Sequence, residues 1–516
     1  MKILMISTEK LPVPPVLGGA IQTYISGILP FLKKAHDITV LGISDPSLPD
    51  KETLDHVHYV RVPGKIFELY HTEVCKYIEQ NEFDLIHIFN RPRLVLPVRQ
   101  AAPKSKITLS MHNDMFNHNK ISFEEANLVL HEVTRIVTVS NYVGNVIRTL
   151  YPQADPKLRT IYSGVDTERF LPGHSPKMQD IRNELRRANG LDNKTVILFA
   201  GRLSHNKGVD RLIRALPELS EKFRDLALVI VGSKWFSKDD MTDYIAYVRA
   251  LAEKLDIPVV STGFVAPNEI QNWFAAADLF VCTSLWQEPL ARVHYEAMAA
   301  GLPIVTTARG GNPEVIIPGE NGLVVDNPEA PADFAEKISE ILSNRLLMKR
   351  MGENGRQLAL SEYQWDRVAS DVLQVWNEAE VTELLEGYET VPNISSNIAK
   401  DGEDTVPDSI AIEAAADHSS HSPEEMELPT PDTSITQGSG KTIWNRKMLS
   451  ALKKKREQKT RKNISAAFAA PPLPVNQFEI SSTQKTKRDT IKSHLRESIR
   501  TNLADFLNGV RNAENT

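Results

Sequence analysis

The stretch TVILFAGRLSHNKGVDRLIRAL, residues 195–216, joins a buried-strand pattern to an amphipathic helix through one short loop. Apolar and β-branched residues run up to Gly201, and apolar residues recur at helical spacing after Gly208. A strand followed at once by a helix is the repeating unit of parallel α/β proteins. Ligands of such sheets bind beyond the carboxyl ends of the strands, so the loop between the two glycines is a predicted binding loop.

The same alternation of strand and helix patterns occurs in two series along the chain. The first series predicts helices at 20–34 and 141–149 and buried strands at 2–7, 37–44, 83–89, 106–112 and 135–140. The second predicts strands at 195–201, 226–232, 258–263, 278–284, 302–307 and 321–325. Polar residues 163–194 between them are typical of a linker. The predicted fold is therefore α/β, with two doubly wound Rossmann-like domains facing a cleft.

Composition restricts the class of protein. The 516 residues carry 60 Lys and Arg against 66 Asp and Glu, a net charge of −6, which argues neither for nucleic acid nor for an acidic substrate. We therefore expect no nucleic-acid partner. The two cysteines, Cys75 and Cys282, provide neither a disulfide framework nor a zinc pattern and favour a reducing compartment. Apolar runs are too short for a signal peptide or for the ~20 residues of a membrane span. We therefore expect a cytoplasmic protein.

The end of the chain differs from the rest in composition. Ser, Thr, Pro, Asp and Glu dominate residues 391–440, which predicts disorder. A basic block, KKKREQKTRK, follows at 453–462, and apolar residues then recur at helical spacing, which predicts an amphipathic helix at 488–510. This tail, residues 389–516, is either solvated or a docking element for a partner or an anionic surface.

A second candidate binding loop lies in WQEPLARVHYEAMAAGLPIV, residues 286–305. Pro289 suits the first turn of a helix, and Gly301 suits its end. Free N–H groups near Leu290 and Ala291, together with the positive end of the helix dipole, predict an anion site there.

Charged side chains in these two loops suggest what the ligand is. Arg202 and Lys207 stand in one loop beside a helix N-terminus, which is well placed for a diphosphate. Glu296, two turns along the predicted helix, can accept two hydrogen bonds, as the paired hydroxyls of a ribose require. The alternatives are solvated cations and a solvated acid on a surface helix.

Two more features follow predicted strands. Gly18 and Gly19 allow the backbone to approach a ligand, but they do not form the G-x-G-x-x-G pattern of a nicotinamide enzyme. His112 closes a strand and is expected to face the cleft, the alternative being a structural histidine. The body of the chain has no Asp-x-Asp and no His/Glu cluster with metal spacing. We therefore expect no metal and no other cofactor.

Together, GRLSHNKGVDRLIRAL, the two glutamates of EPLARVHYE, and GGNPEVIIPGENGLVV resemble family 4 retaining glycosyltransferases of the GT-B fold. The resemblance covers about residues 1–385, with the motifs in the family's order. STEKLPVP, HNDMF, GSKWF and WQEPLARVHYEAMAAGLP are similar to a subgroup of spore coat proteins of endospore-forming bacteria. The acidic-then-basic tail is not part of the family pattern.

The resemblance implies a role for each matched residue of the second domain. Arg202 and Lys207 match the cations that hold the donor diphosphate, and Glu296 matches the glutamate that binds the nucleotide ribose. Glu288 matches the glutamate beside the transferred sugar and is expected to be catalytic. The family usually has glycine where this chain has Ala291, a difference that narrows backbone approach to the sugar.

In the first domain, the resemblance implies that Gly18 and Gly19 form the glycine loop near the phosphate. His112 matches a histidine near the sugar and is the second expected catalytic residue.

The implied domains are an acceptor-side domain (1–165), a nucleotide-sugar donor domain (166–362), a helix returning to the first domain (363–388) and the tail (389–516). The implied reaction moves a sugar from a nucleotide-diphosphate sugar to a carbohydrate, lipid-linked or protein acceptor, with retention at the anomeric carbon. A spore-coat scaffold with little catalysis and a nucleotide-sugar epimerase are the alternatives. Acceptor-dependent release of nucleotide diphosphate would separate the three.

Overall fold

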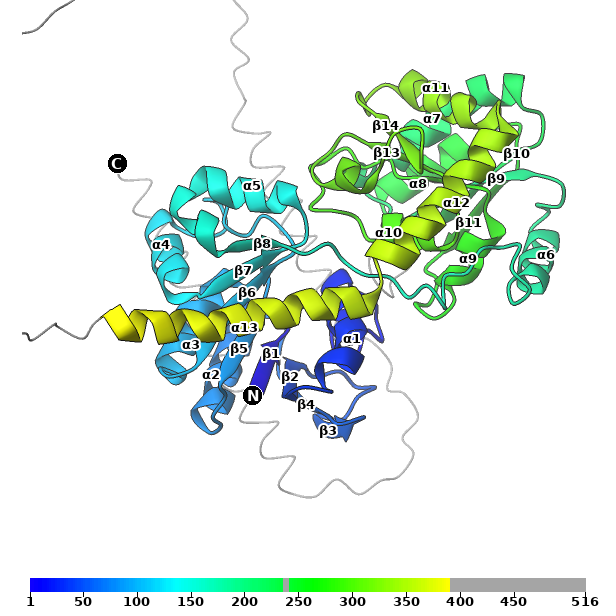
Figure 1. Ribbon diagram of the computed structural model, residues 1–516. Coiled ribbons are helices and arrows are strands. Elements are labelled where there is room, and N and C mark those ends of the chain that lie inside the picture. Colours follow the sequence, from blue (N-terminus) through cyan, green and yellow to red (C-terminus); the bar gives the residue numbers. More distant parts are fainter. Residues whose placement is uncertain (235–240, 390–516) are drawn as a thin grey trace, which may run out of the picture. The chain divides into compact units, whose positions relative to one another are not determined.

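The computed structural model describes residues 1–234 and 241–389. These residues lie within one compact unit that contains two sheets (Figure 1). The strand order is β3-β4-β2-β1-β5-β6-β7-β8 in the first sheet and β11-β10-β9-β12-β13-β14 in the second. The predicted pair of doubly wound α/β domains is confirmed, and we refer to them as the N-terminal and C-terminal lobes.

The N-terminal lobe is built on the eight-stranded sheet. Its strands are β1 (Lys2–Ile6), β2 (Asp37–Ile43), β3 (Lys51–Leu54), β4 (Val57–Val62), β5 (Leu85–Phe89), β6 (Lys106–Met111), β7 (Arg135–Thr138) and β8 (Leu158–Thr160). Its helices are α1 (Ala20–Leu32), α2 (Phe67–Glu79), α3 (Val95–Ala101), α4 (Phe123–Glu132) and α5 (Asn141–Leu150). Sequence reasoning missed β3, β4 and β8. β3 and β8 are short sheet-edge strands with partly exposed side chains, so they lack a long apolar run.

Alternate side chains of each strand point to opposite faces of this sheet. Leu4 and Ile6 pack with residues of α2, α3, α4 and α5, whereas Ile3 and Met5 pack with residues of α1 and of α13 (Trp365–Glu389). Helices therefore cover both faces, and Figure 1 shows α13 crossing the strands on one side.

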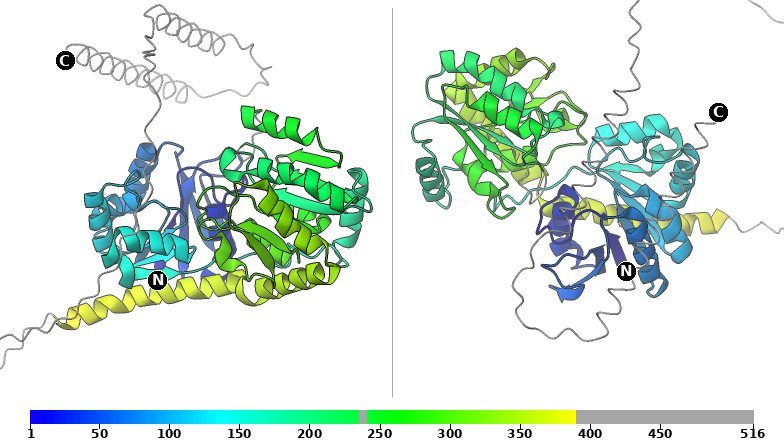
Figure 2. Two further views of the ribbon diagram at one scale, coloured as in Figure 1. Left: turned by 90° about the horizontal axis from the view of Figure 1, so that it is seen from above. Right: turned by 180° about the vertical axis from the view of Figure 1, so that it is seen from behind.

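The C-terminal lobe repeats this plan around the six-stranded sheet (Figure 2). Its strands are β9 (Thr195–Ala200), β10 (Leu226–Val231), β11 (Val259–Gly263), β12 (Leu279–Val281), β13 (Ile304–Thr307) and β14 (Gly322–Val325). Its helices are α6 (Gln179–Ala188), α7 (Val209–Lys222), α8 (Asp243–Ala252), α9 (Ile270–Ala276), α10 (Val293–Ala299), α11 (Pro331–Leu342) and α12 (Arg345–Glu362). β9 pairs in parallel with β12, so the loops that follow these two strands leave the sheet side by side.

The segment predicted as a linker, residues 163–194, is more ordered than that description implies. It contains α6, which packs on α9. The Arg182 side chain donates hydrogen bonds to the carbonyl oxygens of Ala275 (2.6 Å) and Ala277 (2.8 Å). These bonds attach α6 to the C-terminal lobe.

The last described helix, α13, packs on the N-terminal lobe. Trp376 is fully buried there, and its Nε1 donates a hydrogen bond to Nδ1 of His87 at 3.1 Å. At the start of the helix, the Trp365 ring lies against Gly27 and Gly164, where an added Cβ would come within 2.3 and 2.5 Å of the indole. These glycines let the helix approach the first lobe closely.

The predictions for the tail, residues 391–440, 453–462 and 488–510, fall outside the residues that the structure describes. In the described ranges, no helix combines the length and the apolar character needed to cross a membrane.

Candidate active site

A pocket of about 1080 Å³ is lined by loops and helices of both lobes. This volume suits a ligand larger than a simple sugar. The pocket brings together every predicted site residue: Gly18, Gly19, His112, Arg202, Lys207, Glu288, Leu290, Ala291 and Glu296.

Contacts between the loop after β9 and the loop after β12 position Lys207. The hydroxyl of Thr283 donates to the carbonyl oxygen of Lys207 at 2.6 Å. Gly208 has φ 61°, and a Cβ there would lie 2.4 Å from the Thr283 carbonyl oxygen. Only glycine meets both conditions. The loops therefore touch through their backbones, and Nζ of Lys207 donates a hydrogen bond to Oε1 of Glu288.

The Glu288 carboxylate is buried but charged. It is only 4% exposed, and its Oε1 also accepts a hydrogen bond from Oγ of Ser284 at 2.6 Å. Burial by itself would raise the pKa of Glu288, but the charge of Lys207 and the hydrogen bonds from Lys207 and Ser284 lower it below its ordinary value. An ionised acid and a cation therefore stand together in the pocket wall, and Arg202 lines the same pocket just beyond β9.

The predicted anion site near Leu290 and Ala291 was wrong in its details. The helix begins at Val293, not at Pro289, and spans seven residues. The N–H of Ala291 is not free, because it donates to Oδ1 of Asn312 at 3.1 Å. The Asn312 side chain, from a later loop, thus pairs with a backbone donor that was predicted to be free.

Glu296 lies in the first turn of α10, closer to the helix start than predicted. Its Oε1 is 3.6 Å from a guanidinium nitrogen of Arg292, and both side chains are 14% exposed. The two residues line the pocket together.

Sequence reasoning missed Arg292. Its guanidinium donates to Oγ of Ser163 (2.9 Å) and to the carbonyl oxygen of Gly164 (3.1 Å) and lies 5.2 Å from the centroid of the Trp365 ring. Burial lowers its pKa from the ordinary value. The available signal was a lone arginine inside the apolar run LARVHYEAM.

The glycine pair Gly310-Gly311 begins the motif GGNPEVIIPGENGLVV. Gly310 has φ 57°, and a Cβ there would lie 1.9 Å from the carbonyl oxygen of Glu288. The N–H of Gly311 donates to that same oxygen at 2.8 Å. This pair therefore holds the backbone of Glu288 in place.

His112 forms part of the wall in the N-terminal lobe. Its backbone N–H donates to Oδ1 of Asn90 at 3.0 Å. The residue as a whole is partly exposed, but its Nε2 is enclosed and has no hydrogen-bond partner among the described residues. Burial, together with the positive charge of Arg292, lowers the pKa of His112 to about 3. The ring is therefore neutral near pH 7, and its Nε2 can form one hydrogen bond with a ligand.

Gly18 and Gly19, with φ of 84° and 109°, lead into α1. Both positive φ values favour glycine, and at Gly19 an added Cβ would also lie 2.3 Å from Oε1 of Gln22. At the start of α1, no side chain of these two residues stands between the backbone and a ligand in the pocket.

A buried ion pair in the N-terminal lobe was also missed. Glu9 accepts hydrogen bonds from Nε (2.5 Å) and Nη2 (2.9 Å) of Arg91, which lines the pocket. Burial would raise the pKa of Glu9, but Arg91 lowers it overall. The two residues follow different strands, and a single sequence gives no signal that they pair.

Within residues 1–234 and 241–389, no three His, Cys, Asp or Glu side chains converge to hold a metal ion.

Two family models match the chain. Glycosyltransferase Family 4 covers residues 18–169 and Glycosyl transferases group 1 covers residues 181–358. Spore coat protein SA of Bacillus subtilis is 43% identical over 378 residues, which are 73% of this chain and 100% of that protein. The putative glycosyltransferase YtcC of the same organism is 43% identical over 357 residues, 69% of this chain and 87% of that one.

Solved structures share the fold. HepE of Anabaena, in complex with UDP and glucose, has a TM-score of 0.58 at 22% identity and covers 73% of this chain and 99% of its own. Sucrose-phosphate synthase of Thermosynechococcus elongatus has a TM-score of 0.62 at 21% identity and covers 74% and 100%. With its two parallel-sheet lobes and both family domains, this chain belongs to the family 4 glycosyltransferases and has the GT-B fold.

Proposed function

We propose that the enzyme transfers a sugar from a nucleotide-diphosphate sugar to an acceptor and retains the configuration at the anomeric carbon. The observation that carries this proposal is the contact of Lys207 with the buried, ionised Glu288 in a pocket that Arg202 also lines. Cations held in a partly dry site stabilise the charge that develops on a leaving diphosphate.

The residues divide into three groups in this proposal. Arg202 and Lys207 bind the diphosphate, and Glu296 accepts hydrogen bonds from the ribose. Glu288 and His112 stand beside the sugar, where the neutral His112 ring bonds a hydroxyl. Leu290 and Ala291 form the adjoining wall together with the glycine loop at the start of α1.

The chemical step follows from this placement. The bond between the anomeric carbon and the phosphate oxygen breaks, and its electron pair goes to the diphosphate. The acceptor hydroxyl attacks from the face that the diphosphate leaves, and its proton passes to the departing phosphate oxygen. Preorganised positive charge on the diphosphate provides most of the stabilisation of the transition state.

Names of similar proteins support a nucleotide sugar as the co-substrate but differ in the base. HepE was solved with UDP-glucose, and a Mycolicibacterium smegmatis relative at 28% identity is named as GDP-mannose-dependent. A thermal-shift screen of UDP-, GDP- and ADP-sugars identifies the donor. Release of nucleotide diphosphate that requires an acceptor then tests transfer, and NMR of the product tests retention.

We propose that no metal or other cofactor takes part, since Arg202 and Lys207 meet the phosphate charge. The acceptor, whether carbohydrate, lipid-linked or protein, binds on the side of the N-terminal lobe. Nucleic acid is not a partner.

The name of spore coat protein SA supports a place for this enzyme in spore-coat or surface-polysaccharide formation. In this proposal the protein acts in the cytoplasm, and its tail contacts the spore coat or a membrane surface. The same name also favours the second candidate, a coat scaffold with little catalysis. Failure of every nucleotide sugar to bind, with normal assembly at the spore, would decide for the scaffold.

A further inference from the structure

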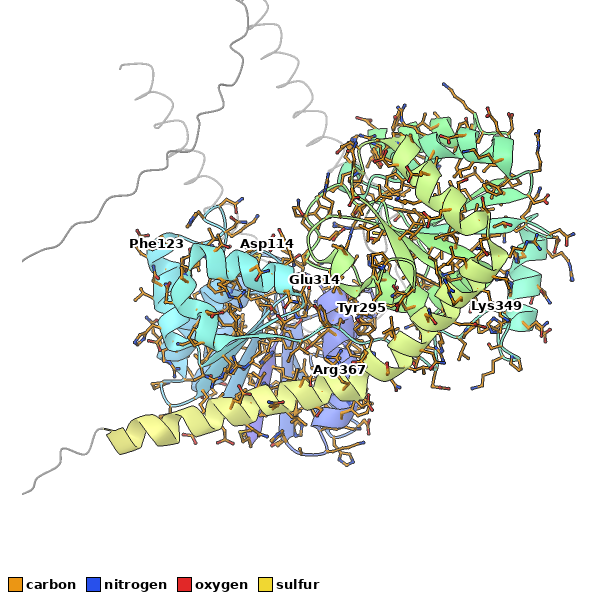
Figure 3. The ribbon with its side chains drawn as sticks, turned by 45° about the horizontal axis from the view of Figure 1, so that its top comes forward. Asp114, Phe123, Tyr295, Glu314, Lys349 and Arg367 are labelled. Carbon is orange, nitrogen blue, oxygen red and sulfur yellow. The ribbon has the colours of Figure 1, made fainter. Side chains whose placement is uncertain are left out.

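Glu314 of the C-terminal lobe accepts hydrogen bonds from two backbone N–H groups of the N-terminal lobe and from the hydroxyl of Tyr162, whose ring packs on the core of the C-terminal lobe. Its Oε1 accepts from the backbone N–H of Tyr142 at 2.6 Å. Its Oε2 accepts from the backbone N–H of Asn141 at 2.7 Å and from the hydroxyl of Tyr162 at 3.0 Å. Glu314 and Asp114, which accepts from the Tyr142 hydroxyl at 2.9 Å, are both labelled in Figure 3.

These contacts require a carboxylate. Asn141 and Tyr142 are the first two residues of α5, where backbone N–H groups have no acceptor inside the helix and the helix dipole favours negative charge. Both oxygens of Glu314 accept hydrogen bonds. Glutamine would offer one acceptor oxygen and would aim its amide N–H groups at another donor.

The segment that carries Glu314 also holds the Glu288 loop. The N–H of Gly311 donates to the carbonyl oxygen of Glu288, and Oδ1 of Asn312 accepts from the N–H of Ala291. Gly311 packs closely on the N-terminal lobe, since an added Cβ would lie 2.8 Å from the Cβ of Ser140 at the start of α5. Residues 310–314 therefore contact the Glu288 loop at one end and the N-terminal lobe at the other.

We propose that Glu314 is a positioning residue that couples contact between the lobes to the geometry of the sugar site. When α5 binds the Glu314 carboxylate, residues 310–314 are held in place, and through them the backbone of Glu288 and Ala291. The pocket is then complete only while the lobes touch. This inference rests on the proposed function, in which the Glu288 loop lies beside the transferred sugar.

The test replaces Glu314 with glutamine in the full chain. Glu314→Gln should lower kcat for sugar transfer about tenfold or more, because the contact between the lobes is populated less. The Kd for UDP, GDP or ADP, whichever binds the wild type, should stay within about twofold, because no nucleotide contact is removed. A defect of folding alone would instead lower the melting temperature and leave the kcat of the folded fraction unchanged.

A distance measurement tests the contact without relying on activity. Spin labels are placed at Leu128→Cys and Leu346→Cys, which are exposed positions on the two lobes, in a Cys75→Ser background. The distance distribution should broaden or shift in Glu314→Gln. The matched control is Glu320→Gln, which removes the same charge from an exposed position a few residues on. It should change neither the distances nor kcat.

Unchanged distances, or an unchanged kcat, in Glu314→Gln overturns the inference. If Glu314→Gln does not fold, the test uses Tyr162→Phe. This variant removes one of the three hydrogen-bond donors to Glu314 and should change kcat and the distances less, in the same direction. No change in Tyr162→Phe would then overturn the inference. If the wild type binds no nucleotide, the proposed function fails, and the distance measurement still decides whether Glu314 holds the lobes together.

Discussion

Lys207 and Glu288 are 81 positions apart in the sequence, yet Nζ of Lys207 donates a hydrogen bond to Oε1 of Glu288 in the pocket wall. The two residues meet because β9 and β12 are neighbours in the sheet and each is followed by a loop at the same edge. The pair explains how a carboxylate that is 4% exposed stays ionised. It also places a cation where a diphosphate is proposed to bind.

Replacing Lys207 tests that placement. Lys207→Ala should lower kcat/KM by an amount equivalent to about 2–4 kcal/mol, since one charge-stabilising group is lost. It should also raise the pKa of Glu288, which would remain buried without its cation. Steady-state kinetics across a pH series measure both effects. Lys222→Ala, at a half-exposed surface pair with Glu218, is the control. Normal turnover in Lys207→Ala would rule out the diphosphate assignment.

The two glutamates should differ in their effects. Glu296→Gln should mainly weaken nucleotide binding, because an amide has one acceptor oxygen for the two ribose hydroxyls. Glu288→Gln should depress turnover and leave the affinity for free nucleotide diphosphate nearly intact. Calorimetric titration of both variants with the nucleotide, beside kcat measurements, separates the roles. Equal losses of affinity would show that the roles are not divided in this way.

Metal independence is tested with a chelator. Two cations line the proposed phosphate site, so EDTA should leave sugar transfer essentially unchanged. The measurement is the initial rate with EDTA, with and without added magnesium or manganese. Loss of activity that either ion restores would contradict the proposal.

Acid should weaken the packing of α13. The Trp376 indole N–H can only donate, so Nδ1 of His87 is the acceptor and the ring is neutral. Burial is the main cause that lowers the pKa of His87 to about 3, against about 6.5 in an unfolded chain. Between these values the unfolded state binds one more proton. The free energy of unfolding should therefore fall as pH is lowered, by about 1.4 kcal/mol per pH unit from His87 alone.

Urea denaturation between about pH 6 and pH 4 measures this slope. His87→Gln should reduce this slope by about 1.4 kcal/mol per pH unit, the contribution of one proton, whatever it does to the free energy of unfolding at a single pH. An undiminished slope in His87→Gln would mean that His87 does not titrate on unfolding.

The tail is expected to determine where the protein is placed, not its chemistry. Truncation after residue 390 keeps the described part of α13 and all of the pocket residues. The truncated protein should remain active with a nearly unchanged melting temperature, and its position in the cell should change. Activity assays, calorimetry and fluorescence microscopy measure the three effects. Unfolding or loss of activity on truncation would place the tail in the folded body.

Local sequence determined most strands of the two series, because buried parallel strands are continuous apolar runs that can be recognised without the rest of the chain. It also indicated the loops where ligands bind, since strand ends and glycines are local signals. Every residue selected on these grounds lines one pocket. The short edge strands β3 and β8 were missed, because a strand with little buried surface leaves little hydrophobic pattern.

Only the tertiary structure decided how the selected residues pair. It showed that Asn312 takes the N–H of Ala291, that Arg292 reaches Ser163, and that Glu314 binds the start of α5. A single sequence carries no record of these contacts, because each joins side chains or backbone groups from distant segments. Hydrogen bonds and ion pairs depend on distances of a few ångströms, and those distances exist only after the sheets and helices have packed.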